Sequence, residues 1–331
     1  MSLAPVRWME DGWFNGLRQL WHASAEWRGQ WVLLQYTALA WSRRGFSFGA
    51  LAVLAMLRRG GARVAVVFHE PDRQRGSGML QGIRGACQDW VIRRLYKGAT
   101  KAIFADPLET ILWLPKNDVK AAFIPIGANV PEPTSRSEAS RAQNGRPQTV
   151  TVFCLTQPPK LERELADISY AIRSATTNGL KLHVVFLGRG TAEAKKEIER
   201  AFVDIPVEVS NLGLLSAEKV SQTLAQSDAM LCVRDRLFPR RGSAIAGIAC
   251  GVPIIGYAGR AERTPLEEAG IVLVPYGDVD ALGVALLRVL DDPNLSRDLQ
   301  EKSSLAQRRY FSWDSIATAF VSVLDLESDS R

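Results

Sequence analysis

Short apolar runs alternate with helix-patterned segments along almost the whole chain, and this alternation limits the fold more than any other feature. Ten runs are nearly continuous in hydrophobicity and rich in Val, Ile and Phe, which is typical of strands buried on both faces of a parallel sheet. They are Trp31–Tyr36, Ala62–Phe68, Ala102–Ala105, Ala121–Ile126, Thr149–Leu155, Leu180–Leu187, Val207–Val209, Ala229–Val233, Pro253–Tyr257 and Ile271–Val274. Helix patterns lie between them at Gly85–Lys97, Thr191–Phe202, Ala217–Ala225 and Val279–Leu290. The sequence therefore predicts an α/β fold with helical crossovers.

One segment interrupts the alternation. Residues 131–148, PEPTSRSEASRAQNGRPQ, are polar and hold no large apolar residue, so we interpret them as a linker. A chain of 331 residues is long for one core. We therefore expect an N-terminal α/β domain at 1–130 and a C-terminal α/β domain at 149–310. A C-terminal helix at 311–331 is expected to pack back on the first domain.

Charge and cysteine usage narrow the class of protein. The formal net charge is +6 and the isoelectric point about 9.2. Acidic partners fit this balance, among them phosphorylated small molecules, anionic lipid and nucleic acid, although a mildly basic protein without such a partner fits it too. The N-terminus lacks the apolar core of a signal peptide, and Gly45–Leu57 is too short to span a bilayer and predicts a buried helix. Four scattered cysteines without metal-ligand spacing indicate reduced thiols in a cytoplasmic compartment: Cys87, Cys154, Cys232 and Cys250.

Three segments follow predicted strands of the second half, where open α/β sheets bind ligands. Gly188-Arg189-Gly190 leads from a strand into a helix and offers backbone N–H groups to an anion, although such a turn is as often a plain connection. Leu212-Gly213-Leu214 is expected in an apolar loop that either lies against a nucleobase or closes over the core.

The third segment, FPRRGSAIAGIACGVPIIGY from Phe238 to Tyr257, carries the most chemistry. Arg240 and Arg241 precede a helix start, where the dipole disfavours cations, so either they face water or an anion binds there. Gly242 allows close backbone approach, and Ser243 is expected to cap the helix. A bound diphosphate accounts for all four residues together.

The order of four motifs resembles the C-terminal domain of GT-B glycosyltransferases, in particular family 4: Gly188-Arg189-Gly190, the segment from Leu212 to Ser216, LAQSD at 224–228 and AIAGIACGVPII at 244–255. GIVLVP at 270–275 and Phe311-Ser312-Trp313 continue the likeness. The resemblance implies two Rossmann-like parallel-sheet domains facing across a cleft. It implies that the second domain binds a nucleotide-sugar donor, with the diphosphate at the helix start and the base near Gly213.

The chain departs from that family at three places. The two glutamates usual around this helix correspond to Phe238 and Ala246, as in a bacterial subgroup with Arg-Arg-Gly-Ser. Glu267 is a substitute candidate for holding the ribose, and Lys160 is a candidate for the family's basic residue after the first strand of this domain. No strand with a glycine-rich loop precedes Trp31, so the N-terminal domain is expected to be abbreviated.

The first half offers one catalytic candidate. His69-Glu70 closes a predicted strand, and such a pair either orients a reacting hydroxyl or forms ordinary loop hydrogen bonds. The resemblance favours His69, because these transferases carry a histidine at this strand end. Basic residues interleave with aromatic ones at 83–101, which fits either peripheral contact with an anionic membrane or a solvated helix face.

We therefore expect a bacterial glycosyltransferase, retaining by resemblance, that moves a sugar from a nucleotide-diphosphate sugar to a sugar or lipid-linked acceptor in polysaccharide or glycoconjugate synthesis. No cofactor, no metal and no nucleic-acid partner is expected. The alternative is a non-catalytic GT-B-like partner or scaffold subunit that keeps a nucleotide pocket. The expected location is cytoplasmic, with contact to the inner face of the membrane.

Overall fold

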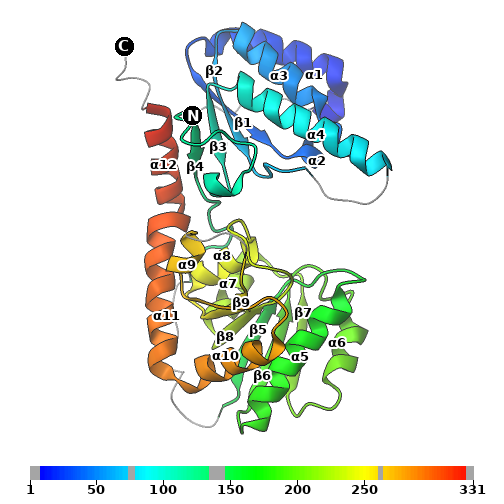
Figure 1. The fold of residues 1–331 in the computed structure, drawn as a ribbon, viewed down its shortest axis with the longest axis vertical. Coiled ribbons are helices and arrows are strands. Elements are labelled where there is room, and N and C mark those ends of the chain that lie inside the picture. Colours follow the sequence, from blue (N-terminus) through cyan, green and yellow to red (C-terminus); the bar gives the residue numbers. More distant parts are fainter. Residues whose placement is uncertain (1–7, 74–78, 134–145, 260–263, 326–331) are drawn as a thin grey trace. The chain divides into compact units, whose positions relative to one another are not determined.

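The computed structural model describes residues 8–73, 79–133, 146–259 and 264–325. The chain divides into two compact units (Figure 1): the first joins Met1–Pro125 to Ala317–Arg331, and the second is Ile126–Ile316. Each unit has its own parallel sheet with helices, so the predicted α/β class is confirmed. The predicted linker at 131–148 falls largely on residues 134–145, outside the described residues.

The sheet of the first unit has four parallel strands in the order β1-β2-β3-β4. They are β1 (Trp31–Tyr36), β2 (Arg63–Phe68), β3 (Lys101–Phe104) and β4 (Ala121–Phe123). β4 is shorter than predicted. Ile124 N still donates to Phe104 O at 3.0 Å, but Pro125 has no N–H to continue the ladder.

Helices α1 (Trp8–Ser24), α2 (Ala38–Trp41), α3 (Phe48–Arg59) and α4 (Met79–Gly98) belong to this unit, with a 3-10 turn at Ala25–Trp27. α3 buries Val53, Leu54 and Leu57, which confirms the buried helix predicted there. The rings of Phe68 and Phe104 stack at 4.9 Å between centroids in the core beneath the helices. α1 has no counterpart among the predictions, because Gly12, with φ 73, breaks its pattern.

The sheet of the second unit has six parallel strands in the order β10-β9-β8-β5-β6-β7. They are β5 (Gln148–Phe153), β6 (Leu182–Leu187), β7 (Glu208–Gly213), β8 (Ala229–Cys232), β9 (Ile254–Tyr257) and β10 (Ile271–Val274). From β5 the chain continues through β6 to β7 at one edge of the sheet. It then returns to β8, beside β5, and continues through β9 to β10 at the other edge. The strand order thus reverses between β5 and β8, and ligands of open α/β sheets bind at the carboxyl ends of such a pair.

The helices of the second unit are α5 (Leu161–Thr177), α6 (Lys195–Phe202), α7 (Ala217–Ala225), α8 (Gly242–Cys250), α9 (Pro265–Glu268), α10 (Val279–Asp291) and α11 (Pro293–Ala306). A π-helical turn at Gln307–Phe311 leads into α12 (Trp313–Asp325), which crosses the boundary between the units. α6 begins at Lys195 rather than Thr191, because the Thr191 side chain and Ala194 N turn back to Gly188 O and Gly190 O. No helix among the described residues is long and apolar enough to cross a membrane.

Candidate functional site

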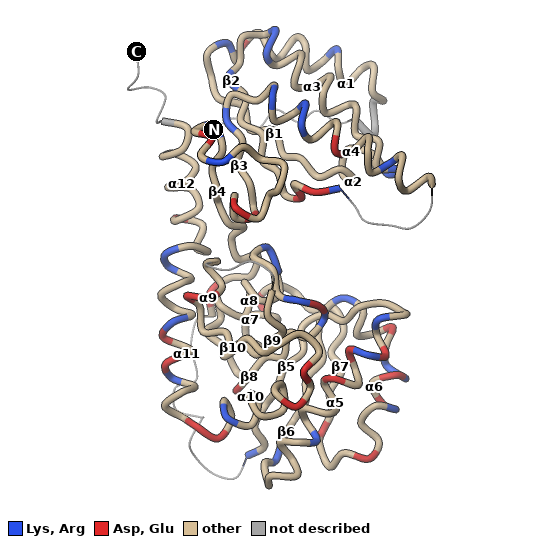
Figure 2. Tube along the Cα trace, in the orientation of Figure 1, with Lys and Arg blue, Asp and Glu red and all other residues tan. Residues whose placement is uncertain are grey.

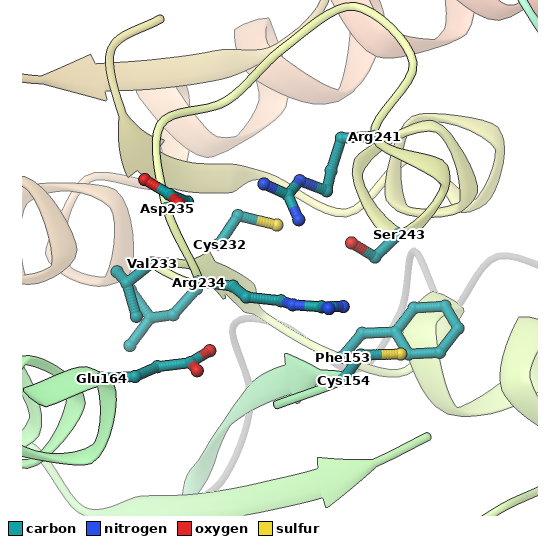
Figure 3. A pocket seen from close by; sticks show the side chains of 10 residues that line it. Phe153, Cys154, Glu164, Cys232, Val233, Arg234, Asp235, Arg241 and Ser243 are labelled. Carbon is teal, nitrogen blue, oxygen red and sulfur yellow. The ribbon is translucent and has the colours of Figure 1, made fainter. Parts of the chain in front are cut away.

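A pocket lies at the carboxyl ends of β5 and β8, where the strand order reverses (Figure 3). β5 and the residue after it contribute Phe153 and Cys154, and the segment after β8 contributes Arg234 and Asp235. The remaining polar lining is Glu164 from α5 and Arg241 and Ser243 at the start of α8.

The segment from β8 to α8 is fixed by its own contacts, so its side chains are held in place. Leu237 is buried, and its N–H donates to Tyr257 O at 2.8 Å. A Cβ on Gly256 would lie 2.6 Å from Leu237 Cδ1, so this close approach requires glycine. Arg236 reaches Ala258 O at 3.3 Å and lies 4.3 Å from the centroid of the Tyr276 ring.

Two guanidinium groups share the pocket. Figure 3 shows Arg234 and Arg241 extending into the same space beside Ser243 and Cys232. Burial lowers the pKa of Arg241, and the like charge of Arg234 acts in the same direction, against the opposing effect of Asp235 and Glu164. Both arginines stay charged, since the guanidinium does not deprotonate in proteins. Two like charges that line one pocket raise the energy of the empty pocket and favour a bound anion.

Glu164 places one carboxyl group beneath this pair. The side chain is 4 % exposed, and its Oε2 accepts hydrogen bonds from Thr156 N at 2.8 Å and Thr156 Oγ1 at 2.6 Å. Burial raises the pKa of Glu164, while these bonds and the charges of Arg234 and Arg241 act in the opposite direction. The carboxyl group thus compensates only part of the positive charge.

A second hollow adjoins the first and shares Glu164, Arg234 and Asp235 with it. Lys160, the basic residue predicted after the first strand of this unit, forms an ion pair here with Asp235, 3.0 Å between Nζ and Oδ2. Tyr276 forms the opposite wall. The structure therefore brings Lys160 next to the arginine pocket through Asp235.

Aromatic and charged groups stiffen the wall of this second hollow. Arg163 Nη1 donates to Tyr276 Oη at 3.0 Å, and its guanidinium carbon lies 4.7 Å from the ring centroid. The buried phenol of Tyr257 donates to Asp167 Oδ2 at 2.8 Å, and its ring meets Tyr276 edge-on at 5.4 Å. The wall is thus built from contacts among its own residues.

The start of α8 differs from the prediction in one respect. Arg241 occupies the N-cap position without a side-chain cap, and Ser243 lies within the first turn, so the predicted Ser243 cap is wrong. The Ser243 hydroxyl instead bonds to the thiol of Cys232, whose pKa burial raises to about 12. The first-turn N–H groups of α8 have no acceptor inside the helix. A Cβ on Gly242 would meet nothing within 4 Å, so the space beside these groups is open.

Arg240 takes a different place from Arg241. Its guanidinium carbon lies 5.1 Å from the Phe238 ring centroid, and it does not line the pocket. Of the four residues predicted to hold a diphosphate, the structure places Arg241 and Ser243 in the pocket and Gly242 at its edge.

The glycines of the Gly188-Arg189-Gly190 turn serve the packing behind the pocket. Both have positive φ, 91 for Gly188 and 86 for Gly190. A Cβ on Gly188 would lie 2.8 Å from the Phe153 ring and 2.9 Å from Cys154 Sγ, two residues of the pocket lining. Arg189 is exposed, and its carbonyl accepts from Leu155 N at 3.0 Å. The turn thus fixes the end of β5, and its residues do not line the pocket.

The predicted apolar loop around Gly213 is wrong in its extent, because β7 continues through Gly213. Gly213 O accepts from Gly188 N at 2.7 Å, and Asn211 Nδ2 donates to Thr191 O at 2.6 Å. These bonds tie the end of β7 to the turn after β6. Leu212 and Leu214 are 43 % and 77 % exposed, so neither closes over the core.

The pocket contains carboxyl groups, but they do not come from Glu267, the acid predicted from the sequence. Glu267 lies exposed in α9 and does not line the pocket. Ala246 is fully buried in α8, and Phe238 lies under Arg241. The acids of the pocket, Glu164 and Asp235, and the second cation, Arg234, were missed in the sequence. The Arg-Asp-Arg run directly after the β8 strand was the available signal.

In the first unit, His69 and Glu70 follow β2 at the carboxyl edge of the sheet. His69 N extends the ladder to Tyr36 O at 3.1 Å, and its Nε2 lies 2.6 Å from Gln35 Oε1. The amide oxygen of Gln35 is the acceptor of this hydrogen bond, and Nε2 is its donor. Both side chains are half-buried.

The four cysteines are free; Cys232 and Cys250 are buried, and Cys87 and Cys154 are partly buried. Among the described residues, no group of three or more His, Cys, Asp or Glu side chains is placed to hold a metal ion.

No protein-family model and no curated protein matches the chain. Solved structures of glycosyltransferases do match it. A glycosyltransferase from Rickettsia africae is 11 % identical with a TM-score of 0.67, over 100 % of this chain and 85 % of that one. HepE from Anabaena, solved with UDP and glucose, is 15 % identical with a TM-score of 0.62, over 98 % and 84 %.

TarM from Staphylococcus aureus, solved with UDP and a GlcNAc-glycerol, is 12 % identical with a TM-score of 0.62. The alignment covers 94 % of this chain and 59 % of TarM, so the chain spans less than two thirds of that protein's length. At these identities the likeness establishes the fold. The chain has two parallel-sheet α/β units, in agreement with its GT-B glycosyltransferase neighbours.

Proposed function

We propose that the chain transfers a glycosyl group from a nucleoside diphosphate sugar to an acceptor sugar or lipid-linked sugar. The observation that carries this proposal is the pair Arg234 and Arg241, two like charges converging beside the open first turn of α8. A diphosphate supplies the negative charge that this pair and the helix end favour. The neighbours of the same fold include proteins solved with UDP or UDP-glucose.

We assign a role to each residue of the pocket from its position there. Arg241, Arg234 and the N–H groups of α8 would hold the diphosphate and stabilise the charge that develops on it as the glycosyl bond breaks. Lys160 and Asp235 would contact the donor from the adjoining hollow, whose walls also present Tyr276. Glu164 would influence the donor only through its charge near Arg234 and Arg241, because its Oε2 is bound to Thr156 Oγ1.

On the acceptor side, His69 is the proposed catalytic residue and Glu70 its neighbour at the same strand end. Nε2 is bound to Gln35, so Nδ1 is the ring nitrogen that we propose takes a proton from an acceptor hydroxyl. We infer retention of the anomeric configuration and a role in bacterial polysaccharide or glycoconjugate synthesis at the cytoplasmic side from the resemblance to family 4. No cofactor or metal is part of the proposal.

A panel of ligands tests the proposal. The melting temperature of the full chain is measured with UMP, UDP, UDP-glucose and other nucleoside diphosphates and their sugars, followed by release of the nucleotide from the sugar donor with and without acceptor sugars. Stabilisation by a diphosphate, weaker stabilisation by the monophosphate, and slow release are expected. Stabilisation without release or transfer would assign the chain to the non-catalytic alternative, and no stabilisation by any nucleotide would contradict the site.

A further inference from the structure

Large apolar side chains are exposed on the helices of the first unit. We use the name aromatic face for eight of them, all at least 39 % exposed: Trp13, Phe14, Phe46, Phe48, Met79, Leu80, Ile83 and Trp90. Met79 and Leu80 are the extreme cases at 84 % and 82 %. Exposed apolar groups gathered in this number on one part of a protein mark an interaction surface.

Contacts between the helices involve three of these residues, Trp13, Phe48 and Trp90. The Trp13 ring lies against Gly49 of α3, since a Cβ there would be 2.1 Å from the ring, and its centroid is 6.4 Å from that of Trp41 in α2. The rings of Phe48 and Trp90 meet at 6.1 Å between α3 and α4. Through Trp13, Phe48 and Trp90 these contacts connect the parts of the face on α1, α3 and α4.

The loop between α2 and α3 is fixed within this face. Gln88 Nε2 of α4 donates to Gly45 O at 3.2 Å, and Tyr36 Oη bonds to Ser47 Oγ at 2.8 Å. Phe46 is thus presented by a loop held from both sides. The starts of α3 and α4 gather with α2 at one end of the unit, the end reached by β1 as it runs into α2 (Figure 1).

The charge of the helices that carry this face is mainly positive. Residues 8–59 and 79–98 hold ten arginines and lysines and four acids, Glu10, Asp11, Glu26 and Asp89. Asp89 pairs with Arg73 at 3.4 Å, and α4 carries no other acid (Figure 2). Arg43 and Arg44 are exposed in the loop beside Phe46, and Arg94 lies 5.3 Å from the Trp90 ring centroid.

We propose that the aromatic face docks on an anionic lipid bilayer. Exposed Trp, Phe, Met and Leu side chains enter the boundary between headgroups and acyl chains, and the surrounding arginines bind the anionic headgroups. A second copy of the chain seated face to face would oppose the same positive charges, so the charge favours lipid over self-association. The inference does not depend on the donor site, because the face lies wholly in the first unit and binds without a nucleotide.

Flotation of the full chain with vesicles tests this. Phosphatidylcholine vesicles with phosphatidylglycerol should carry the protein, and vesicles of phosphatidylcholine alone should bind it at least about tenfold more weakly. Added salt should weaken the binding to the mixed vesicles. Absence of binding to the mixed vesicles, or equal binding to both kinds, would overturn the proposal.

Matched variants locate the surface. Met79→Ser with Leu80→Ser should weaken binding at least about tenfold, whereas Leu112→Ser with Val119→Ser, which removes two equally exposed residues elsewhere in the unit, should not. Arg43→Gln with Arg44→Gln should weaken binding, and Lys195→Gln with Lys196→Gln in α6 should not. Unchanged melting temperatures establish that the variants fold. An equal loss in the control variants, or a dimer in solution that Met79→Ser with Leu80→Ser dissociates, would contradict lipid as the occupant.

Discussion

The guanidinium carbon of Arg241 lies 4.2 Å from the centroid of the Phe238 ring. This stacking directs Arg241 toward the pocket from the N-cap of α8, a position without a side-chain cap. The ring contributes no charge, so the pocket keeps the positive potential of its two arginines.

Replacement of Phe238 with Ala should therefore weaken binding of a nucleoside diphosphate by about three- to thirtyfold, because Arg241 loses the ring that orients it. Phe238→Tyr keeps a ring and should bind within about twofold of the original chain. Isothermal titration with UDP measures both. Equal affinities in all three proteins would show that the stacking does not position Arg241.

The stability of the chain should carry a pH dependence from Glu164. Burial raises the pKa of this carboxyl above its ordinary value of 4.5, so the folded chain holds the proton more tightly than the unfolded chain. The contribution of Glu164 to the free energy of unfolding is therefore fully present below pH 4.5. It is lost as the pH rises through the pKa of this carboxyl in the folded chain.

Glu164→Gln, which does not titrate, should gain melting temperature relative to the original chain as the pH rises to neutrality. Thermal melts across this range measure the difference. Glu162→Gln, at an exposed position of the same helix, is the matched control. Parallel curves for Glu164→Gln and the original chain would show that the carboxyl is not held in its neutral form.

Substitution of Gly242 should change ligand binding and the free energy of unfolding in different ways. Its Cβ position is open and its φ is not positive, so Gly242→Ala should preserve or raise the free energy of unfolding by up to about 1 kcal/mol. The added methyl group occupies the space beside the first-turn N–H groups, and UDP binding should weaken. Urea unfolding and titration measure the two quantities. Unchanged binding would place the diphosphate elsewhere.

Gly188 should matter for the fold. Gly188→Ala brings a Cβ against Phe153 and Cys154 at a positive φ, and we expect a loss of about 2–4 kcal/mol in the free energy of unfolding. Gly179→Ala is the matched control, since φ is 88 there and nothing lies within 4 Å of the new atom. Its loss should be about 1–2 kcal/mol, the conformational cost alone. Equal losses would mean that the turn is not tightly packed.

The strands were predictable because each is an apolar run of its own, and all ten predicted strands exist with ends shifted by few residues. Errors arose where tertiary contacts decide the outcome. β7 extends to Gly213 because its carbonyl pairs with Gly188 N across to the next strand, a partner that no local pattern reveals. α6 starts late because Thr191 turns back to Gly188.

The arginine-rich helix start was predictable from the sequence, but its partners were not. Glu164 belongs to α5, whose apolar and polar residues gave no sign that one carboxyl faces inward. Arg234 and Asp235 follow β8, and only the position of β8 beside β5 brings them to Glu164 and Cys154. Arg240 and Arg241 are adjacent in sequence and both lie near the Phe238 ring, yet only Arg241 lines the pocket.

Titration of UDP into single variants of the three arginines tests the central claim most directly. Arg234→Ala and Arg241→Ala should each weaken binding at least about tenfold, because each removes a charged donor to the diphosphate. Arg240→Ala should bind within about twofold of the original chain, as expected for a cation outside the pocket. Equal affinity in Arg241→Ala and the original chain, with the fold intact, would contradict the assignment of this pocket as the diphosphate site.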